Sequence, residues 1–169
     1  PTYRGPLACI IMSQEFYETD PSRDFKRGYT FQMGRGQGPA PTATGGVSWG
    51  KNHHAEFAER FGKNLGLGVI GDDLPEEKNR VELDKKLTDR YGIPAPKIIY
   101  RVGNNSKHLL AHGVNSARTV LESAGASRII SSQLSTNAGW HLMGTARMGE
   151  DPTLSVVNQY GQAHEADNV

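Results

Sequence analysis

The sequence predicts an α+β fold, with a largely antiparallel β-sheet and helices packed on one face of it. Short segments with the alternating apolar pattern of strands outnumber helical segments, and the two kinds do not follow each other in strict β-α-β order. Glycine accounts for 20 of the 169 residues, which favours many turns over long helices. A chain of this length can bury a core without disulfides, and its single cysteine, Cys9, excludes an internal one.

The first part of the chain predicts two strands, each followed by a loop. Residues 3–12 carry apolar side chains after a glycine-proline break and form the first expected strand. The polar residues 20–26 predict a loop, and the alternating residues 29–33 predict a half-buried strand. Glycines and prolines then predict a long flexible loop over a pocket at residues 34–46.

The middle of the chain predicts a helix and two more strands. Residues 52–61 place apolar side chains at helical spacing, and residues 65–70 form an apolar, glycine-containing strand. Residues 80–84 alternate cleanly between polar and apolar. We therefore expect Val81 and Leu83 to face a core.

The longest helix is expected over residues 106–124, after a further strand at residues 97–102. Gly125 stands where a helix of this length would end. Apolar residues at alternating spacings of four and three predict the buried face of this helix. They are Leu110, Val114, Ala117, Leu121 and Ala124. Near the end of the chain, residues 154–157 and a turn at 158–161 predict a hairpin.

Charge and hydropathy exclude several classes of partner. The formal net charge is only +1, whereas nucleic-acid binding requires a concentrated basic face, so we expect no nucleic-acid partner. The longest apolar runs span only a few residues, so we expect no membrane segment. Composition assigns no compartment to the chain.

One glycine motif matches the dinucleotide fingerprint but lacks its context. Residues 66–71 read Gly-Leu-Gly-Val-Ile-Gly, and such a motif binds pyrophosphate only between a strand and a helix that opens at the third glycine. Here a helix is expected before the motif, and Asp72 and Asp73 follow it, whose carboxylates would repel a phosphate. We therefore interpret the motif as a glycine-rich strand.

Other polar clusters are also interpreted as structural. His108 and His112 have zinc-ligand spacing on the expected helix, but no glutamate separates them, so a solvated helix face is favoured and no metal site is expected. An exposed charged turn is favoured for the four carboxylates Asp72, Asp73, Glu76 and Glu77. Asn105 or Ser106 is expected to cap the long helix.

The strongest candidate for chemistry is His141. It lies in an aperiodic segment punctuated by glycines, beside Trp140, and such loops place titratable groups at pockets. An imidazole, with a pKa near neutrality, is suited to accept a proton from a hydroxyl group. On chemistry alone, a purely structural histidine is the favoured alternative.

The same segment resembles a known family. Residues 141–149, His-Leu-Met-Gly-Thr-Ala-Arg-Met-Gly, with Asp151-Pro152 and residues 155–157, resemble the C-terminal signature of the glucose-methanol-choline (GMC) oxidoreductases. Upstream, residues 79–84, Asn-Arg-Val-Glu-Leu-Asp, resemble the family's Asn-Arg-Val-x-Leu strand. The resemblance departs from the family pattern in the hairpin, at Asn158, Gln162 and Glu165.

The resemblance implies an FAD enzyme that oxidises a small-molecule alcohol, such as a sugar, a polyol or a choline-like compound. It implies that His141 is the active-site base, which accepts the hydroxyl proton while the carbinol hydride moves to flavin N5. Trp140 would contact the flavin or line the pocket.

The resemblance also implies a division of the chain. Residues 1–135 would form the substrate-binding α+β domain, and residues 136–169 would form the active-site loop and a hairpin that returns to the FAD-binding domain. That FAD domain, with the main FAD motif and a second active-site residue, would lie outside this chain. We therefore expect the fragment to be inactive alone.

Two other functions stay open from the sequence. A non-redox relative, such as a hydroxynitrile lyase, would use the same histidine as an acid and base. A non-catalytic carbohydrate-binding or structural module would bind its ligand without turnover.

Overall fold

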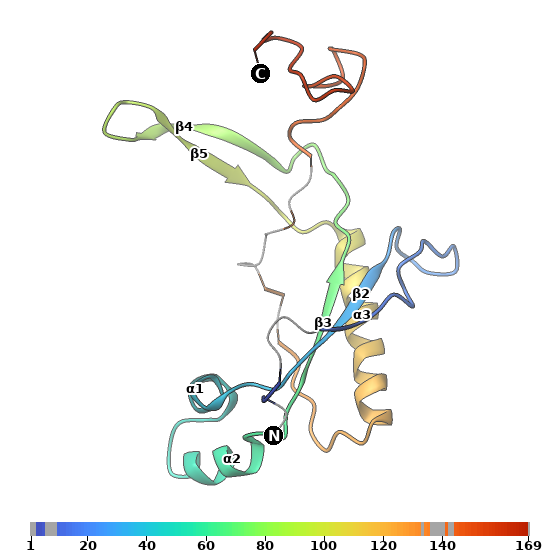
Figure 1. Cartoon of the computed structure of the whole chain (residues 1–169), viewed down its shortest axis with the longest axis vertical. Helices are drawn as coiled ribbons and strands as arrows, with labels where there is room; N and C mark the ends of the chain where they lie inside the picture. Colours follow the sequence, from blue (N-terminus) through green and yellow to red (C-terminus); the bar gives the residue numbers. More distant parts are fainter. Residues whose placement is uncertain (1–2, 6–9, 133, 136–140, 142–143, 169) are drawn as a thin grey trace. The chain divides into compact units, whose positions relative to one another are not determined.

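The computed structural model describes residues 3–5, 10–132, 134–135, 141 and 144–168 (Figure 1). The chain divides into two compact units. The first comprises residues 1–74 and 102–131, and the second comprises residues 75–101 and 132–169. Both contain antiparallel sheets, and the described helices lie in the first unit, so the predicted α+β class is confirmed.

The first unit is built on a three-stranded antiparallel sheet. Its strands, in spatial order, are β1 (Ile11–Ser13), β2 (Tyr29–Gly34) and β3 (Gly66–Gly71). The register places Phe31 opposite Val69 and Tyr29 opposite Gly71. All three expected strands are present, although the described part of the first is shorter than predicted.

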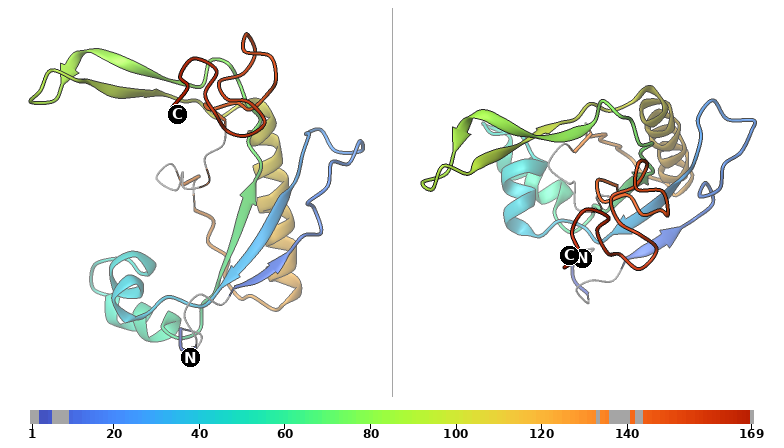
Figure 2. Two further views of the ribbon diagram at one scale, coloured as in Figure 1. Left: turned by 45° about the horizontal axis from the view of Figure 1, so that its top comes forward. Right: turned by 90° about the horizontal axis from the view of Figure 1, so that it is seen from above.

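The long helix α3 (Asn104–Ser123) covers one face of this sheet and runs beside β2 and β3 (Figure 2). The buried core of the unit is made of Phe25, Tyr29, Phe31, Leu109 and Ala117. The helix is amphipathic, so it forms by burying one face against the aromatic residues of β2.

The buried face of α3 differs from the predicted one. Its buried residues are Ser106, Leu109, Gly113 and Ala117, whereas the predicted residue Val114 is 37% exposed. Of the predicted stripe only Ala117 is buried; Leu110 and Leu121 are half-buried. The pattern of large apolar residues was misleading because this helix packs through small residues.

Two glycines let α3 approach the sheet closely. A Cβ atom on Gly113 would lie 2.5 Å from Val69 Cγ1 and 3.4 Å from the Tyr29 ring. A Cβ atom on Gly71 would lie 2.3 Å from Leu109 Cδ2. Only glycine fits at these two positions without displacing the neighbouring side chains.

The two ends of α3 are fixed in different ways. At the C-terminus Ala126 N–H donates to Leu121 O and Gly125 N–H donates to Glu122 O, and Gly125 has a φ of 81°, which together form a Schellman motif. At the N-terminus the cap is Gly103, without a side-chain hydrogen bond, so the prediction of an Asn105 or Ser106 cap is wrong. These two side chains have other partners, because Asn105 pairs with the Lys26 backbone and Ser106 donates to Asp73.

The residues between β2 and β3 are more helical than predicted. A helical turn at α1 (Pro39–Pro41) continues into a π-helical turn (Thr42–Gly46), so the predicted loop at 34–46 is wrong over its second half. The buried Thr42 stabilises this turn, because its hydroxyl donates to Gly38 O. The helix α2 (His53–Arg60) is confirmed.

The second unit contains a long two-stranded hairpin. Its strands are β4 (Arg80–Thr88) and β5 (Pro94–Ile99). The alternation predicted for β4 is correct, but Val81 is 53% exposed and Leu83 is 68% exposed, so the prediction that they face a core is wrong. Alternation determines which residues share a face, whereas burial also requires an element packed on that face.

The close approach at Gly113 gives a first prediction. We expect Gly113→Ala to lower the free energy of unfolding by up to about 2 kcal/mol, because an overpacking cost of about 1–3 kcal/mol exceeds the roughly 1 kcal/mol that alanine contributes to helix propensity. Urea unfolding of the protein measures this change. The matched control is Asn115→Ala at an exposed position of the same helix, which should leave stability unchanged or slightly higher.

A double variant separates steric overlap from other causes. Val69→Ala removes the atom that the new Cβ would meet, so Gly113→Ala should cost less in that background than in the wild type. Equal costs in both backgrounds would contradict the proposed close packing.

Candidate functional site

His141, the candidate base, is an exposed residue in a bend of the second unit. No hydrogen bond or ion pair joins its ring to another residue that the structure describes. Trp140 lies outside the described residues, so its predicted contact with a flavin or pocket stays a prediction.

The chain turns sharply at Gly144 and Thr145, within the segment 141–149 that carries His141. Gly144 has a φ of 91° and Thr145 a φ of 63°, and Ala146 N–H donates to Gly144 O at 2.8 Å. A β-branched residue in the left-handed region is strained, and such strain persists only where the surroundings hold it.

The backbone on the far side of this turn is held by a small network of hydrogen bonds. Gly149 N–H donates to Val157 O at 2.9 Å, and Val156 N–H donates to Arg147 O at 2.8 Å. His164 N–H donates to Val156 O at 3.0 Å, which adds a third segment beside the first two. The expected turn at residues 158–161 is present, but isolated bridges take the place of the predicted hairpin strands.

The side chain of His164 closes this network. Its Nε2 atom lies 2.9 Å from Ser155 Oγ and 3.1 Å from Gly149 O. A carbonyl oxygen only accepts hydrogen bonds, so Nε2 must carry a proton and donate. The Ser155 hydroxyl then donates to Asp151 O or to Gly149 O, which lie 2.5 and 3.0 Å from its Oγ atom.

This arrangement does not match the one that a nucleophilic serine needs from its histidine. A nucleophilic serine requires an unprotonated histidine nitrogen to accept its proton. Here the nitrogen that faces Ser155 is already the donor to Gly149 O. The pair is therefore a structural clamp on the backbone.

The glycine motif at residues 66–71 does not fit a cofactor. It forms β3 and pairs along its whole length with β2, which confirms the glycine-rich strand. The next helix of the described chain begins only at Asn104, so no helix opens at the third glycine, as the pyrophosphate-binding motif requires. Residues 66–71 therefore supply no dinucleotide cradle.

The predicted histidine pair on α3 is divided between two environments. His108 is exposed and pairs with Asp24 at 3.0 Å, as expected for a solvated face. His112 was predicted wrongly, because it is half-buried against the rings of Phe16 and Phe25, and its Nδ1 lies 2.8 Å from Tyr29 Oη. Burial raises the pKa of the Tyr29 phenol above its ordinary value, so the phenol stays protonated and can donate to His112.

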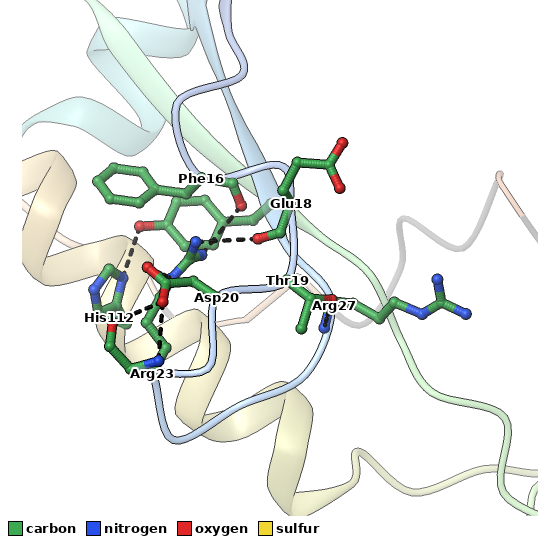
Figure 3. A network of polar contacts seen from close by, with 9 residues as sticks. Phe16, Glu18, Thr19, Asp20, Arg23, Arg27 and His112 are labelled. Atoms are coloured by element: carbon green, nitrogen blue, oxygen red, sulfur yellow. Dashed lines mark hydrogen bonds and ion pairs between the residues drawn. The ribbon is translucent and has the colours of Figure 1, made fainter.

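The loop beside His112 is held by arginine contacts (Figure 3). The Arg23 guanidinium donates to Glu18 O at 3.0 Å, pairs with Asp20 at 3.4 Å and lies over the Phe16 ring. Arg27 N–H donates to Thr19 Oγ1 at 3.1 Å. All of these contacts lie within the first unit and order the edge of its core.

Two apolar hollows lie along the sheet of the first unit. One hollow, of about 380 Å³, is lined by Ile11, by Met33 and by residues 34–36, which follow Met33 in the chain. The other, of about 340 Å³, is lined mainly by apolar residues, with Glu15 at its margin. Both are lined by residues of the first unit, whereas His141 belongs to the second.

Other candidate groups have plain structural roles. Asp72, Asp73 and Glu77 are exposed, as predicted, whereas Glu76 is half-buried and pairs with Lys78 at 2.5 Å. Within the described part of the chain, no three histidine, cysteine or acidic residues gather as metal ligands would. None of the described helices combines the length and apolar character needed to cross a bilayer.

Ser155 and His164 were missed from the sequence. Nothing in the spacing of these residues distinguishes His164 from an exposed histidine near a turn. The clamp exists because the turn at residues 158–161 returns the chain past residues 156–157. The turn signal at Asn158 and Gly161 was the only available indication.

Comparison with known proteins identifies the family. Residues 75–169, which include both the β4–β5 hairpin and the His141 segment, match the family model of the GMC oxidoreductases. The chain belongs to this family, and the resemblance noticed in its motifs is confirmed.

Its relatives are alcohol- and sugar-oxidising enzymes by name. The chain is 36% identical to 2-methyl-1,2-propanediol dehydrogenase of Mycolicibacterium austroafricanum, over 99% of this chain and 31% of that protein. It is 34% identical to paromamine 6'-oxidase of Streptomyces fradiae, over 76% of this chain and 24% of that protein. It is 26% identical to the gluconate 2-dehydrogenase flavoprotein of Pantoea cypripedii, over 76% and 22% of the two chains. The chain thus spans less than a third of the length of these relatives.

The carboxyl group of Asp151, whose backbone carbonyl lies beside Ser155 Oγ, has a shifted pKa. The hydroxyl and the backbone N–H of Thr153 both donate to Asp151 Oδ1, at 2.7 and 2.8 Å, and hold the pKa of Asp151 below its ordinary value of 3.8. The contribution of this turn to stability is therefore present above pH 3.8 and is lost as the pH falls through the lowered pKa.

This gives a second prediction. Thr153→Val should raise the Asp151 pKa toward its ordinary value, because the largest cause of the shift is removed. A carboxyl-carbon NMR titration measures it. Thr153→Ser, which retains the hydroxyl, should keep the pKa low, and an unchanged pKa in the valine variant would contradict the assigned contacts.

Proposed function

We propose that the intact protein is an FAD-dependent oxidoreductase that oxidises an alcohol, with His141 as the base. The observation that carries the proposal is the family match over residues 75–169, within which His141 is an exposed imidazole. The names of the relatives, which are dehydrogenases and an oxidase, support oxidation over other chemistries.

His141 supplies the proton transfer in this proposal. Its imidazole accepts the proton of the substrate hydroxyl, and a positioned base of this kind contributes about 10²–10⁴-fold to a rate. The resulting imidazolium stabilises the developing alkoxide. FAD, when bound in the intact protein, supplies the acceptor for the carbinol hydride.

The cofactor would be held mainly by parts of the protein outside this chain. The glycine motif at residues 66–71 forms a strand of the sheet, and the relatives are more than three times as long as the matched region. We propose that residues 1–135 belong to the substrate-binding domain and residues 136–169 to the part that meets the FAD-binding domain. Trp140 would line the pocket beside His141.

The proposed substrate is a polar molecule with two or more hydroxyl groups. The compounds in the names of the relatives, 2-methyl-1,2-propanediol, paromamine and gluconate, all share this property. The reacting carbon must carry a hydrogen to be lost as hydride. In 2-methyl-1,2-propanediol only the primary carbinol carries one, which makes this diol a suitable probe.

The third prediction tests His141. In the intact protein, His141→Ala should slow anaerobic flavin reduction by about 10²–10⁴-fold while the flavin stays bound, because the base is removed and the cofactor site is not. Stopped-flow absorbance measures the rate with 2-methyl-1,2-propanediol, gluconate and paromamine as probes. His54→Ala, at another exposed histidine, is the matched control and should react at the wild-type rate.

The same experiment separates the alternatives. A primary deuterium isotope effect with the diol labelled at its primary carbinol carbon would support hydride loss there. A hydroxynitrile lyase would show no bleaching with any alcohol, and near-normal rates in His141→Ala would refute the assignment of the base.

The fourth prediction concerns the cofactor. The 169-residue chain, purified by itself, should show no flavin absorbance after mixing with FAD and gel filtration, because its described residues lack a dinucleotide cradle. The intact protein treated in the same way is the positive control. Retained flavin in the 169-residue chain would place the main cofactor site within it.

A further inference from the structure

We propose that His164 is a positioning residue for His141, acting through the backbone clamp that it forms with Gly149 and Ser155. This inference rests on the proposed function of His141. It adds a residue that neither the family match nor the sequence motifs assign to the reaction.

The clamp gives His164 a defined mechanical role. Its Nε2–H is shared between Gly149 O and Ser155 Oγ, at 3.1 and 2.9 Å. These two atoms belong to opposite ends of the segment 149–155, so a single imidazole holds both ends together. The imidazole is half-buried, which shields these hydrogen bonds from water.

Gly149 is the residue of the segment 141–149 that the clamp contacts directly. Its N–H donates to Val157 O, and its neighbour Met148 forms a bridge with Val157. A Cβ atom on Gly149 would lie 3.1 Å from Ser155 Cβ, so the two backbones are already in close contact. Both polar groups of the Gly149 backbone are thereby fixed, the N–H by Val157 and the carbonyl by His164.

A strained residue lies in the chain between this fixed backbone and His141. Thr145, at a φ of 63°, lies between His141 and the hydrogen-bonded residues Arg147 and Gly149. A β-branched residue stays in that conformation only when its surroundings determine the path of the chain. The clamp supplies this constraint on the C-terminal side. Loss of the clamp would let the turn relax and displace the segment that carries His141.

The expected effect follows from the sensitivity of proton transfer to position. A displacement of about 1 Å from a distant substitution can lower a rate about 100-fold. We therefore expect His164→Ala in the intact protein to lower the rate of anaerobic flavin reduction by about 10–100-fold. The probe is 2-methyl-1,2-propanediol, or whichever of gluconate and paromamine reduces the wild-type protein faster.

A double-variant cycle with His141→Ala distinguishes positioning from a general structural effect. If His164 acts through His141, then His164→Ala should have little further effect in the His141→Ala background. Equal fold-changes in the two backgrounds would overturn the positioning role while leaving the proposed function intact. A wild-type rate in His141→Ala would overturn the proposed function itself.

Two substitutions of similar size test the position of the donor. The amide nitrogen of His164→Gln reaches the place of Nε2, so this variant should retain most of the rate. His164→Asn is too short to reach both acceptors and should behave like His164→Ala. Equal rates in the two amide variants would contradict the clamp.

Ser155→Ala keeps the test decisive if the His164 variants do not fold. It removes one acceptor of Nε2 and leaves the bond to Gly149 O, so a several-fold loss in the same rate is expected. That loss should also vanish in the His141→Ala background. An unchanged rate in Ser155→Ala, or a loss that persists in that background, would overturn the inference.

Discussion

The close contact between α3 and the β2–β3 pair is the constraint on which the first unit depends. Gly113 of the helix faces Val69 and Tyr29, and Gly71 of the strand faces Leu109, so each element has its glycine where the other presents a side chain. Because dispersion contacts weaken steeply with distance, this approach brings the aromatic residues of β2 into dense packing under the helix. The sheet, the helix and the ordered loop at residues 20–28 all meet at Tyr29, whose phenol also hydrogen-bonds His112.

The described residues of the second unit are held by hydrogen bonds, and they bury few apolar side chains. Its hairpin leaves Val81, Leu83 and Ile98 exposed, and the segment after His141 is held by the backbone bonds of Arg147 and Gly149 and by the imidazole of His164. Such a network fixes a backbone path without a core, since each bond restrains particular atoms. If His141 is the base, as proposed, these hydrogen bonds would help to fix its position.

Much of the fold was predictable from local patterns. The strands at Tyr29 and Gly66 and the helix that ends two residues before Gly125 were found because period and glycine chemistry are local properties. The buried face of α3 was not found, because large apolar residues at Val114 and Leu121 suggested a different face. Burial of a small residue such as Gly113 depends on what lies opposite, which a single helix does not encode.

The sequence by itself determined the family, the candidate base and the absence of a nucleotide cradle at residues 66–71. Each of these rests on residue identity and order within a short stretch of chain. The tertiary structure decided that His112 joins an aromatic core while His108 stays in solvent, and that His164 holds Gly149 and Ser155. The physical reason is that a side chain's partners depend on the path of the backbone between distant residues, and that path is fixed only when the packed elements meet.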